Sequence, residues 1–153
     1  MPKLEQQWYL SFDIKPKGNV GQFGNIFHAT KGGNSATYGD RIPAIWFLPG
    51  QLKMHICCSI NSKKNHCFNT DTDLPTTTFT NVRVSQTWNS THYVYQIFVN
   101  GDLKSSQVNF SPDVFKNVKV YAADPWYPAA NADVKNLVFQ NIPSGKWYYN
   151  IWR

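Results

Sequence analysis

The strongest constraint on the fold of this chain is the dipeptide Asn100-Gly101, which separates two runs of strand-forming residues. Residues 92–99 read His-Tyr-Val-Tyr-Gln-Ile-Phe-Val, and residues 102–108 continue the pattern beyond the dipeptide. Asn-Gly between such runs favours a type I′ turn, because both turn positions need a positive φ, which Asn and Gly tolerate. The sequence therefore predicts a tight antiparallel hairpin in this part of the chain.

Alternation of apolar and polar residues, the pattern of a half-buried strand, recurs along the rest of the chain. Turn residues such as Pro49-Gly50 separate the runs, and Pro43 requires its strand to begin at or after it or to lie on a sheet edge. Further strands are expected at 8–14, 25–30, 41–48, 52–60, through Cys67 and Phe68, and at 81–86, 116–123 and 134–139. With no convincing helix or repeat, roughly nine or ten short strands predict an all-β, two-sheet antiparallel β-sandwich.

Charge and composition narrow the class of partner. Eight of the nine acidic residues are Asp, and Glu5 is the only glutamate, which suits turns and strands rather than helices. The net charge is +6, but the fifteen basic residues are scattered and only Lys63-Lys64 are adjacent. A nucleic-acid binder usually gathers its basic residues on one stripe, so we expect no nucleic-acid partner. A mildly basic, solvated surface is the simplest interpretation, and attraction to sulfated or sialylated glycans is the alternative.

Several weak signals favour an extracellular or cell-surface setting. Asn89-Ser90-Thr91 and Asn109-Phe110-Ser111 are acceptors for N-glycosylation. Residues 1–5 lack the apolar core of a signal peptide, and no apolar run reaches the ~18 residues of a membrane span. We therefore expect a piece of a longer secreted chain that does not insert into membranes, with an intracellular protein as the alternative.

The three cysteines lie close together at Cys57, Cys58 and Cys67. If residues 61–64 form the loop of a hairpin, Cys58 falls directly opposite Cys67. Opposed residues of an antiparallel pair can be close enough for a disulfide. We predict a Cys58–Cys67 disulfide in an oxidising compartment and three free thiols in a reducing one.

The order of strands resembles the concanavalin A-like lectin/glucanase superfamily, including its laminin G-like members. The matching stretches are 8–13, 25–30, 44–47, 95–101 and 118–122 with 134–139. The resemblance implies a jelly-roll sandwich with the first and last strands adjacent, glycan binding at rim loops or on a concave sheet, and calcium in some members. The Trp-Gly-x-Glu turn of galectins and the Glu-x-Asp-x-x-Glu strand of glucanases are absent, since Glu5 is the only glutamate.

Candidate sugar-binding residues lie in the proline-flanked loop after the 116–123 strand. Trp126 and Tyr127 offer rings for the apolar face of a sugar, while Asp124 and Asn131 offer hydrogen-bond partners for its hydroxyl groups. Asp40 and Arg41 are second candidates. The alternative is that these aromatic rings fold back to cover the open end of the sandwich, as loop aromatics often do. Trp46, in the expected 41–48 strand, fits the alternating core face, so we expect it to pack in the core.

Metal and catalytic signals are weaker. Asp71 and Asp73, in a loop rich in oxygen ligands, are candidates for a calcium site, against the alternative of a solvated loop whose side chains cap their own backbone. The four histidines are isolated in sequence, without the partner spacing of a zinc site. No nucleophile motif or acid pair typical of a glycosidase is present, so we expect no enzyme activity.

The chain is expected to be a single sandwich domain over 1–153, with 143–153 as an aromatic C-terminal extension. These features favour a non-catalytic carbohydrate-binding or adhesion module that recognises a glycan or glycoprotein through rim loops. The competing class is a protein-interaction or assembly module of a larger secreted or cell-surface protein. Its interface for a partner or for a second copy would be the aromatic tail 146–153.

Overall fold

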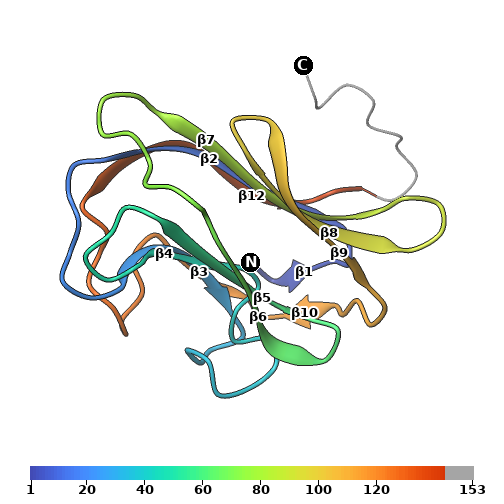
Figure 1. Ribbon diagram of the computed structural model, residues 1–153. Helices are drawn as coiled ribbons and strands as arrows, with labels where there is room; N and C mark the ends of the chain where they lie inside the picture. The colour runs from blue at the N-terminus through green and yellow to red at the C-terminus, as the bar shows by residue number, and fades with distance from the viewer. Residues whose placement is uncertain (144–153) are drawn as a thin grey trace.

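Two antiparallel sheets face each other across the hydrophobic core in the computed structural model, which describes residues 1–143 (Figure 1). The first sheet contains, in spatial order, β11 (Lys119–Tyr121), β3 (Gly24–Thr30), β4 (Ala44–Phe47), β5 (Met54–Ile60) and β6 (Lys63–Asn69). The second contains β12 (Ala132–Asn141), β2 (Trp8–Pro16), β7 (Thr80–Trp88), β8 (Tyr93–Val99) and β9 (Asp102–Asn109). The predicted all-β, two-sheet antiparallel sandwich is confirmed.

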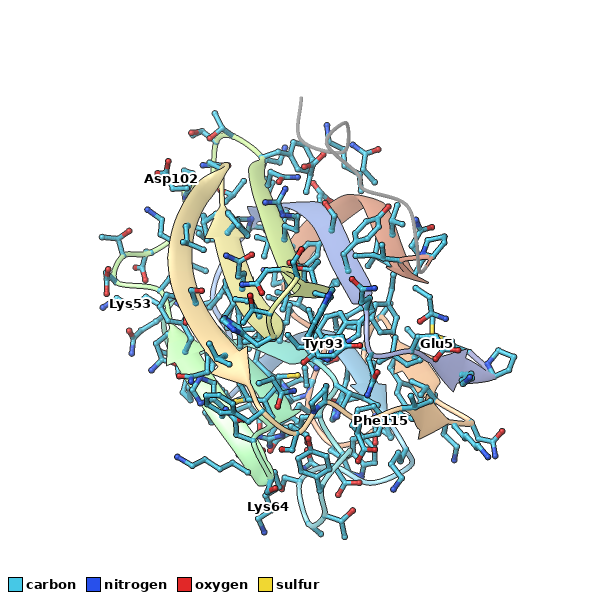
Figure 2. All side chains as sticks on the ribbon, turned by 90° about the vertical axis from the view of Figure 1, so that its right-hand side faces the viewer. Glu5, Lys53, Lys64, Tyr93, Asp102 and Phe115 are labelled. Carbon is cyan, nitrogen blue, oxygen red and sulfur yellow. A yellow bond between two sulfur atoms is a disulfide. The ribbon has the colours of Figure 1, made fainter. Side chains whose placement is uncertain are left out.

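A third, two-stranded sheet pairs β1 (Lys3–Leu4) with β10 (Phe115–Lys116). Glu5 and Phe115 mark this pair in Figure 2, which looks at the right-hand end of Figure 1. Leu4 and Phe115 are buried in the main core. β1 is too short to show an alternating pattern and was not predicted. The segment 116–123 was predicted as one strand, but Asn117, with a φ of 54°, interrupts it, so Lys116 belongs to β10 and residues 119–121 form β11.

The core lies between the sheets and follows the predicted alternation. Along β2 every second side chain is buried, beginning with Trp8, while the residues between them are half-buried. From the opposite sheet the core receives Phe27, Ile45, Phe47 and Ile56. β12 pairs with β2, so the first long strand and the last are adjacent, as the resemblance implied. β4 begins directly after Pro43, which confirms the limit that this proline sets.

The turns decide the strand register. Asn100 and Gly101 have φ angles of 51° and 84°, which confirms the predicted tight hairpin between β8 and β9. Between β5 and β6 the turn consists of Asn61 and Ser62, both with positive φ, and Ile60 pairs with Lys63. The expected four-residue loop at 61–64 is therefore wrong.

The disulfide joins Cys57 to Cys67, not Cys58 to Cys67. The two-residue turn, together with a bulge between Cys58 and Ile60, places Cys57 directly opposite Cys67 and Cys58 opposite His66. Cys58 points instead into the core as a free thiol. Burial raises the pKa of this thiol above its ordinary range, so it is a core side chain and not a reactive one.

No helix occurs among residues 1–143, and so none of the length and hydropathy needed to cross a membrane. The aromatic segment 146–153 lies outside the described residues.

Replacement of a ring in the core tests this architecture. Phe12 is fully buried, whereas Phe110 is 80% exposed. We expect Phe12→Ala to lower the free energy of unfolding by about 3–5 kcal/mol, because it removes buried apolar surface and leaves a cavity. Phe110→Ala should change it by less than about 0.5 kcal/mol. Equal effects of the two variants in urea denaturation would contradict the assigned core.

Candidate functional site

A second apolar cluster lies on the outer face of the first sheet, away from the main core. Trp46, Ala44 and Cys57 form its buried centre, and Phe23 and Tyr127 pack against it. In β4, side chains at alternate positions point to opposite faces, so Trp46 faces outward while its neighbours Ile45 and Phe47 face the core. The assignment of Trp46 to the core face was wrong, because every residue of β4 is apolar and buried and the sequence shows no alternation there.

The outer cluster surrounds a pocket of about 200 Å³. Its walls are Phe23, Arg41, Trp46, His55 and Tyr127, which we call the aromatic pocket. The Tyr127 ring stands nearly edge-on to Trp46 at 5.6 Å between centroids and to Phe23 at 5.9 Å. Phe23 and Tyr127 are half-buried whereas Trp46 is 1% exposed, so the first two rings offer apolar surface at the opening, beside one permanent cation.

That cation is the half-buried guanidinium of Arg41. It lies 4.6 Å from the centroid of the Trp46 ring, and its Nε donates a hydrogen bond to the Asn34 carbonyl at 3.2 Å. None of the ion pairs in the described part of the chain involves Arg41. Burial lowers the pKa of the guanidinium, although Tyr127 and Asp124 act in the opposite direction. Arg41 stays charged, because its ordinary pKa lies far above neutral.

A fully buried hydrogen-bonded pair, His28 and Asp124, contacts the pocket residues Trp46 and Tyr127. His28 Nδ1 lies 2.7 Å from an Asp124 carboxylate oxygen, and both side chains are 0% exposed. His28 Nε2 lies 2.6 Å from the backbone carbonyl of Asp40. The Asp124 carboxylate and the Asp40 carbonyl both accept hydrogen bonds, so each of the two contacts with the His28 ring needs a proton. The pair thus links β3 to the loop after β11 and to the segment that carries Arg41.

Asp124 also fixes the loop that presents the aromatic rings. Its other carboxylate oxygen accepts hydrogen bonds from the amides of Trp126 at 3.0 Å and Tyr127 at 2.9 Å. Its own amide donates to the Asn25 side chain at 2.9 Å. The carboxylate is buried and occupied on both oxygens, so the structure gives Asp124 a positioning role in place of the expected direct contact with a sugar.

Asp40 has a similar internal role. Its carboxylate is buried and accepts a hydrogen bond from the Thr37 amide at 2.8 Å, and its backbone carbonyl meets His28. Gly33 lies against this carboxylate, where an added Cβ would approach an oxygen to 2.6 Å. Asp40 thus holds the 33–41 segment in place and does not reach the pocket opening.

The other predicted sugar-binding residues lie in different places relative to the pocket. Tyr127 and Arg41 line the aromatic pocket. Trp126 is 38% exposed and packs on His28 with 5.2 Å between ring centroids, beside the pocket but not in its wall. Asn131 is elsewhere, with its carbonyl accepting from the Lys17 amide. Tyr127 packs on the outer face of the first sheet and not over the open end of the sandwich, where the alternative placed it.

Sequence reasoning missed three pocket residues, Phe23, Trp46 and His55. Phe23 lies in a polar stretch between strands, and Trp46 was assigned to the core. His55 did carry a usable signal, because it stands two residues before Cys57 in an alternating strand and so shares its face.

The predicted calcium ligands do not belong to a larger acidic cluster. Asp71 and Asp73 are exposed, and one Asp73 oxygen accepts a hydrogen bond from the Leu52 amide at 3.1 Å. Within residues 1–143, the one set of three metal-ligating side chains with ligand atoms within 4.8 Å of one another is His55, Cys57 and Cys67. Calcium binding at Asp71 and Asp73 stays a prediction.

The two glycosylation acceptors differ in accessibility. Asn89 is exposed at the end of β7, and its attachment of a glycan stays a prediction. Asn109 is buried, and its amide nitrogen donates to the Gln86 side chain at 2.7 Å. This geometry contradicts Asn109 as an attachment site, because a glycan needs that nitrogen free and exposed.

Comparisons with known proteins identify the fold. No family model matches the chain, and no curated protein matches it in sequence. Among solved structures, the chain is similar to the native heptameric SAP-like pentraxin from Limulus polyphemus, with a TM-score of 0.60 and 12% identity over 94% of this chain and 68% of the pentraxin chain.

Receptor-binding domains of botulinum neurotoxins are also similar to this chain. The binding domain of neurotoxin DC, solved in complex with SialylT, has a TM-score of 0.56 and 11% identity over 90% of this chain. The receptor-binding domain of neurotoxin D has a TM-score of 0.53 and 15% identity over 88% of this chain. The chain spans only about a third of each toxin chain, 33% and 34%. These likenesses define the fold as a jelly-roll β-sandwich.

The buried pair of His28 and Asp124 leads to a testable prediction about stability. We expect Asp124→Ala to lower the free energy of unfolding by about 3 kcal/mol, because it leaves His28 and two loop amides buried without their acceptor. Amide hydrogen exchange at Trp126 and Tyr127 should become faster. Asp71→Ala, an exposed aspartate, is the control and should change stability by less than about 0.5 kcal/mol. Equal stability of the two variants would contradict the positioning role.

Proposed function

We propose that this chain is a non-catalytic carbohydrate-binding module of the concanavalin A-like type, with the aromatic pocket as its ligand site. The observation that carries the proposal is the pocket itself, in which the half-buried Tyr127 and Phe23 rings lie over the buried Trp46. Beside them is the Arg41 cation, which forms no ion pair with any other residue of 1–143. Sugars have apolar C–H faces that pack on aromatic rings. Their hydroxyl and carboxylate oxygens accept hydrogen bonds, which a guanidinium supplies as a planar set of donors.

The chemistry of the pocket supports binding without catalysis. A retaining or inverting glycosidase needs two carboxyl groups that flank the scissile bond. Among residues 1–143, no carboxyl group lines the pocket, and the neighbouring Asp40 and Asp124 are buried and hydrogen-bonded internally.

Two further observations agree with this proposal. A toxin domain of the same fold was solved with SialylT, although the chain matches only a third of that protein and the match does not locate a shared site. The Cys57–Cys67 disulfide suits an oxidising compartment, which supports an extracellular or cell-surface setting within a longer secreted chain.

A protein-interaction role is the second candidate, and strand β12 favours it. β12 is an edge strand of the second sheet, and its Val134, Leu137 and Val138 side chains are exposed. An exposed apolar edge is a surface on which a partner or a second copy can add a strand. If the tail 146–153 contributes to this interface, its removal should change the oligomeric state. Light scattering would then show a change in the mass of the assembly beyond that of the deleted residues.

Substitution in the pocket tests the leading proposal. On a glycan array we expect saturable binding to a defined sugar class, with Tyr127→Ala and Arg41→Met weakening it at least about tenfold, or ~1.4 kcal/mol. Trp88→Ala removes an exposed ring that is not part of the pocket and is the matched control. No binding by the folded wild-type protein, or equal binding by all variants, would contradict the pocket as a glycan site.

The same array separates the pocket from a calcium-dependent site. The pocket wall contains no carboxylate to hold calcium, so binding should be unchanged by a chelator. Loss of binding in chelator would implicate Asp71 and Asp73 instead.

A further inference from the structure

Three potential metal ligands lie together on the outer face of β5 and β6. His55 stands two residues before Cys57 on the same face of β5, and Cys67 lies directly opposite Cys57 on β6. His55 Nε2 is 3.1 Å from the Cys57 sulfur, and the ligand atoms of the three residues lie within 4.8 Å of one another. The cysteines form a disulfide here, so neither offers a thiolate.

The histidine is oriented as a ligand. His55 Nδ1 lies 2.6 Å from the Asn69 side-chain oxygen, an acceptor, on the residue directly opposite in β6. That bond places a proton on Nδ1 and leaves Nε2 with its lone pair toward the sulfur atoms. A hydrogen bond from the second ring nitrogen to an oxygen is the arrangement that orients histidine ligands in metal sites.

We propose that reduction of the Cys57–Cys67 disulfide converts this cluster into a Zn²⁺ site, with His55, Cys57 and Cys67 as the protein ligands. Two thiolates and an imidazole form a ligand set that suits Zn²⁺. Three protein ligands leave one tetrahedral position for water or a small exogenous ligand. The site lies next to the aromatic pocket through His55, but it does not depend on glycan binding.

The redox step balances with a dithiol as reductant. A thiolate of the dithiol attacks the Cys67 sulfur, which is the exposed member of the pair, and displaces Cys57. The second thiol of the reductant completes the exchange, so the protein gains two electrons and two protons while the dithiol becomes a disulfide. Zn²⁺ binding then displaces both thiol protons. Cys58 takes no part, because it is buried on the core side of β5.

Metal titration of the reduced protein tests the proposal. The protein is reduced with a dithiol, freed of it without oxygen and titrated with Co²⁺, whose thiolate complexes absorb strongly in the near ultraviolet. We expect a single equivalent of Co²⁺ to bind, Zn²⁺ to displace it, and the disulfide form to bind neither. The proposal would be overturned if the reduced protein shows no thiolate–cobalt absorption.

Variants identify the third ligand. His55→Gln should weaken Co²⁺ and Zn²⁺ binding to the reduced protein by more than about tenfold, and Asn69→Ala by about tenfold, the effect of an orienting partner. His66→Gln is the matched control, because His66 lies next to Cys67 but packs toward Tyr95 on the other face. Equal affinities of the His55→Gln variant and wild type would overturn the assignment.

The fold of the reduced protein is the remaining control. The site exists only while β5 and β6 are paired, and we expect the backbone hydrogen bonds of this antiparallel pair to hold it without the disulfide. Near-ultraviolet circular dichroism should therefore keep its folded signal after reduction and before metal is added. Loss of that signal at this step would also overturn the proposal.

Discussion

The candidate site depends on the buried pair of His28 and Asp124. Burying two ionisable groups is costly, and here that cost is offset by hydrogen bonds that occupy both imidazole nitrogens and both carboxylate oxygens. The same bonds connect three segments that are distant in sequence: strand β3, the backbone at residue 40, and the loop after β11. Tyr127 and Arg41 meet at one pocket because this pair fixes the two segments that carry them.

The outer faces of the two sheets differ in what covers them. At the centre of the first sheet, β3 and β4 are buried on both faces, since the loop after β11 crosses over them and is bonded to Asn25 at Pro128 and Ala130. This covering loop leaves a gap beside Trp46 that becomes the aromatic pocket. The second sheet instead exposes polar side chains and the apolar residues of its edge strand β12. Both proposed sites therefore lie on the first sheet, where His55 belongs both to the pocket wall and to the sulfur cluster.

The fold could be predicted because alternation and turn residues are local signals. The repeated alternation predicted the sandwich, and Asn100-Gly101 predicted the β8–β9 hairpin at one edge of the second sheet. The cysteine pairing could not be predicted, because a two-residue turn at Asn61 and Ser62 and one bulge shift the register by a single position, and such a shift reverses which face a side chain occupies.

Trp46 was assigned to the wrong face of its strand for a related reason, since a strand covered on both faces loses its alternation. Trp126 and Tyr127 could be identified as loop aromatics, and Arg41 as the charged residue at the start of the 41–48 strand. The internal role of Asp124 could not, because it depends on contacts with His28, 96 positions away.

The central claim is that a glycan occupies the aromatic pocket. Titration of isotopically labelled protein with a glycan that it binds, followed by heteronuclear NMR, tests this most directly. We expect the largest shift changes at the Trp46 indole, the Arg41 Nε–H and the amide of Tyr127, with little change along β12. Changes confined to β12 or to the loop at Asp71 and Asp73, with the Trp46 indole unmoved, would contradict the account.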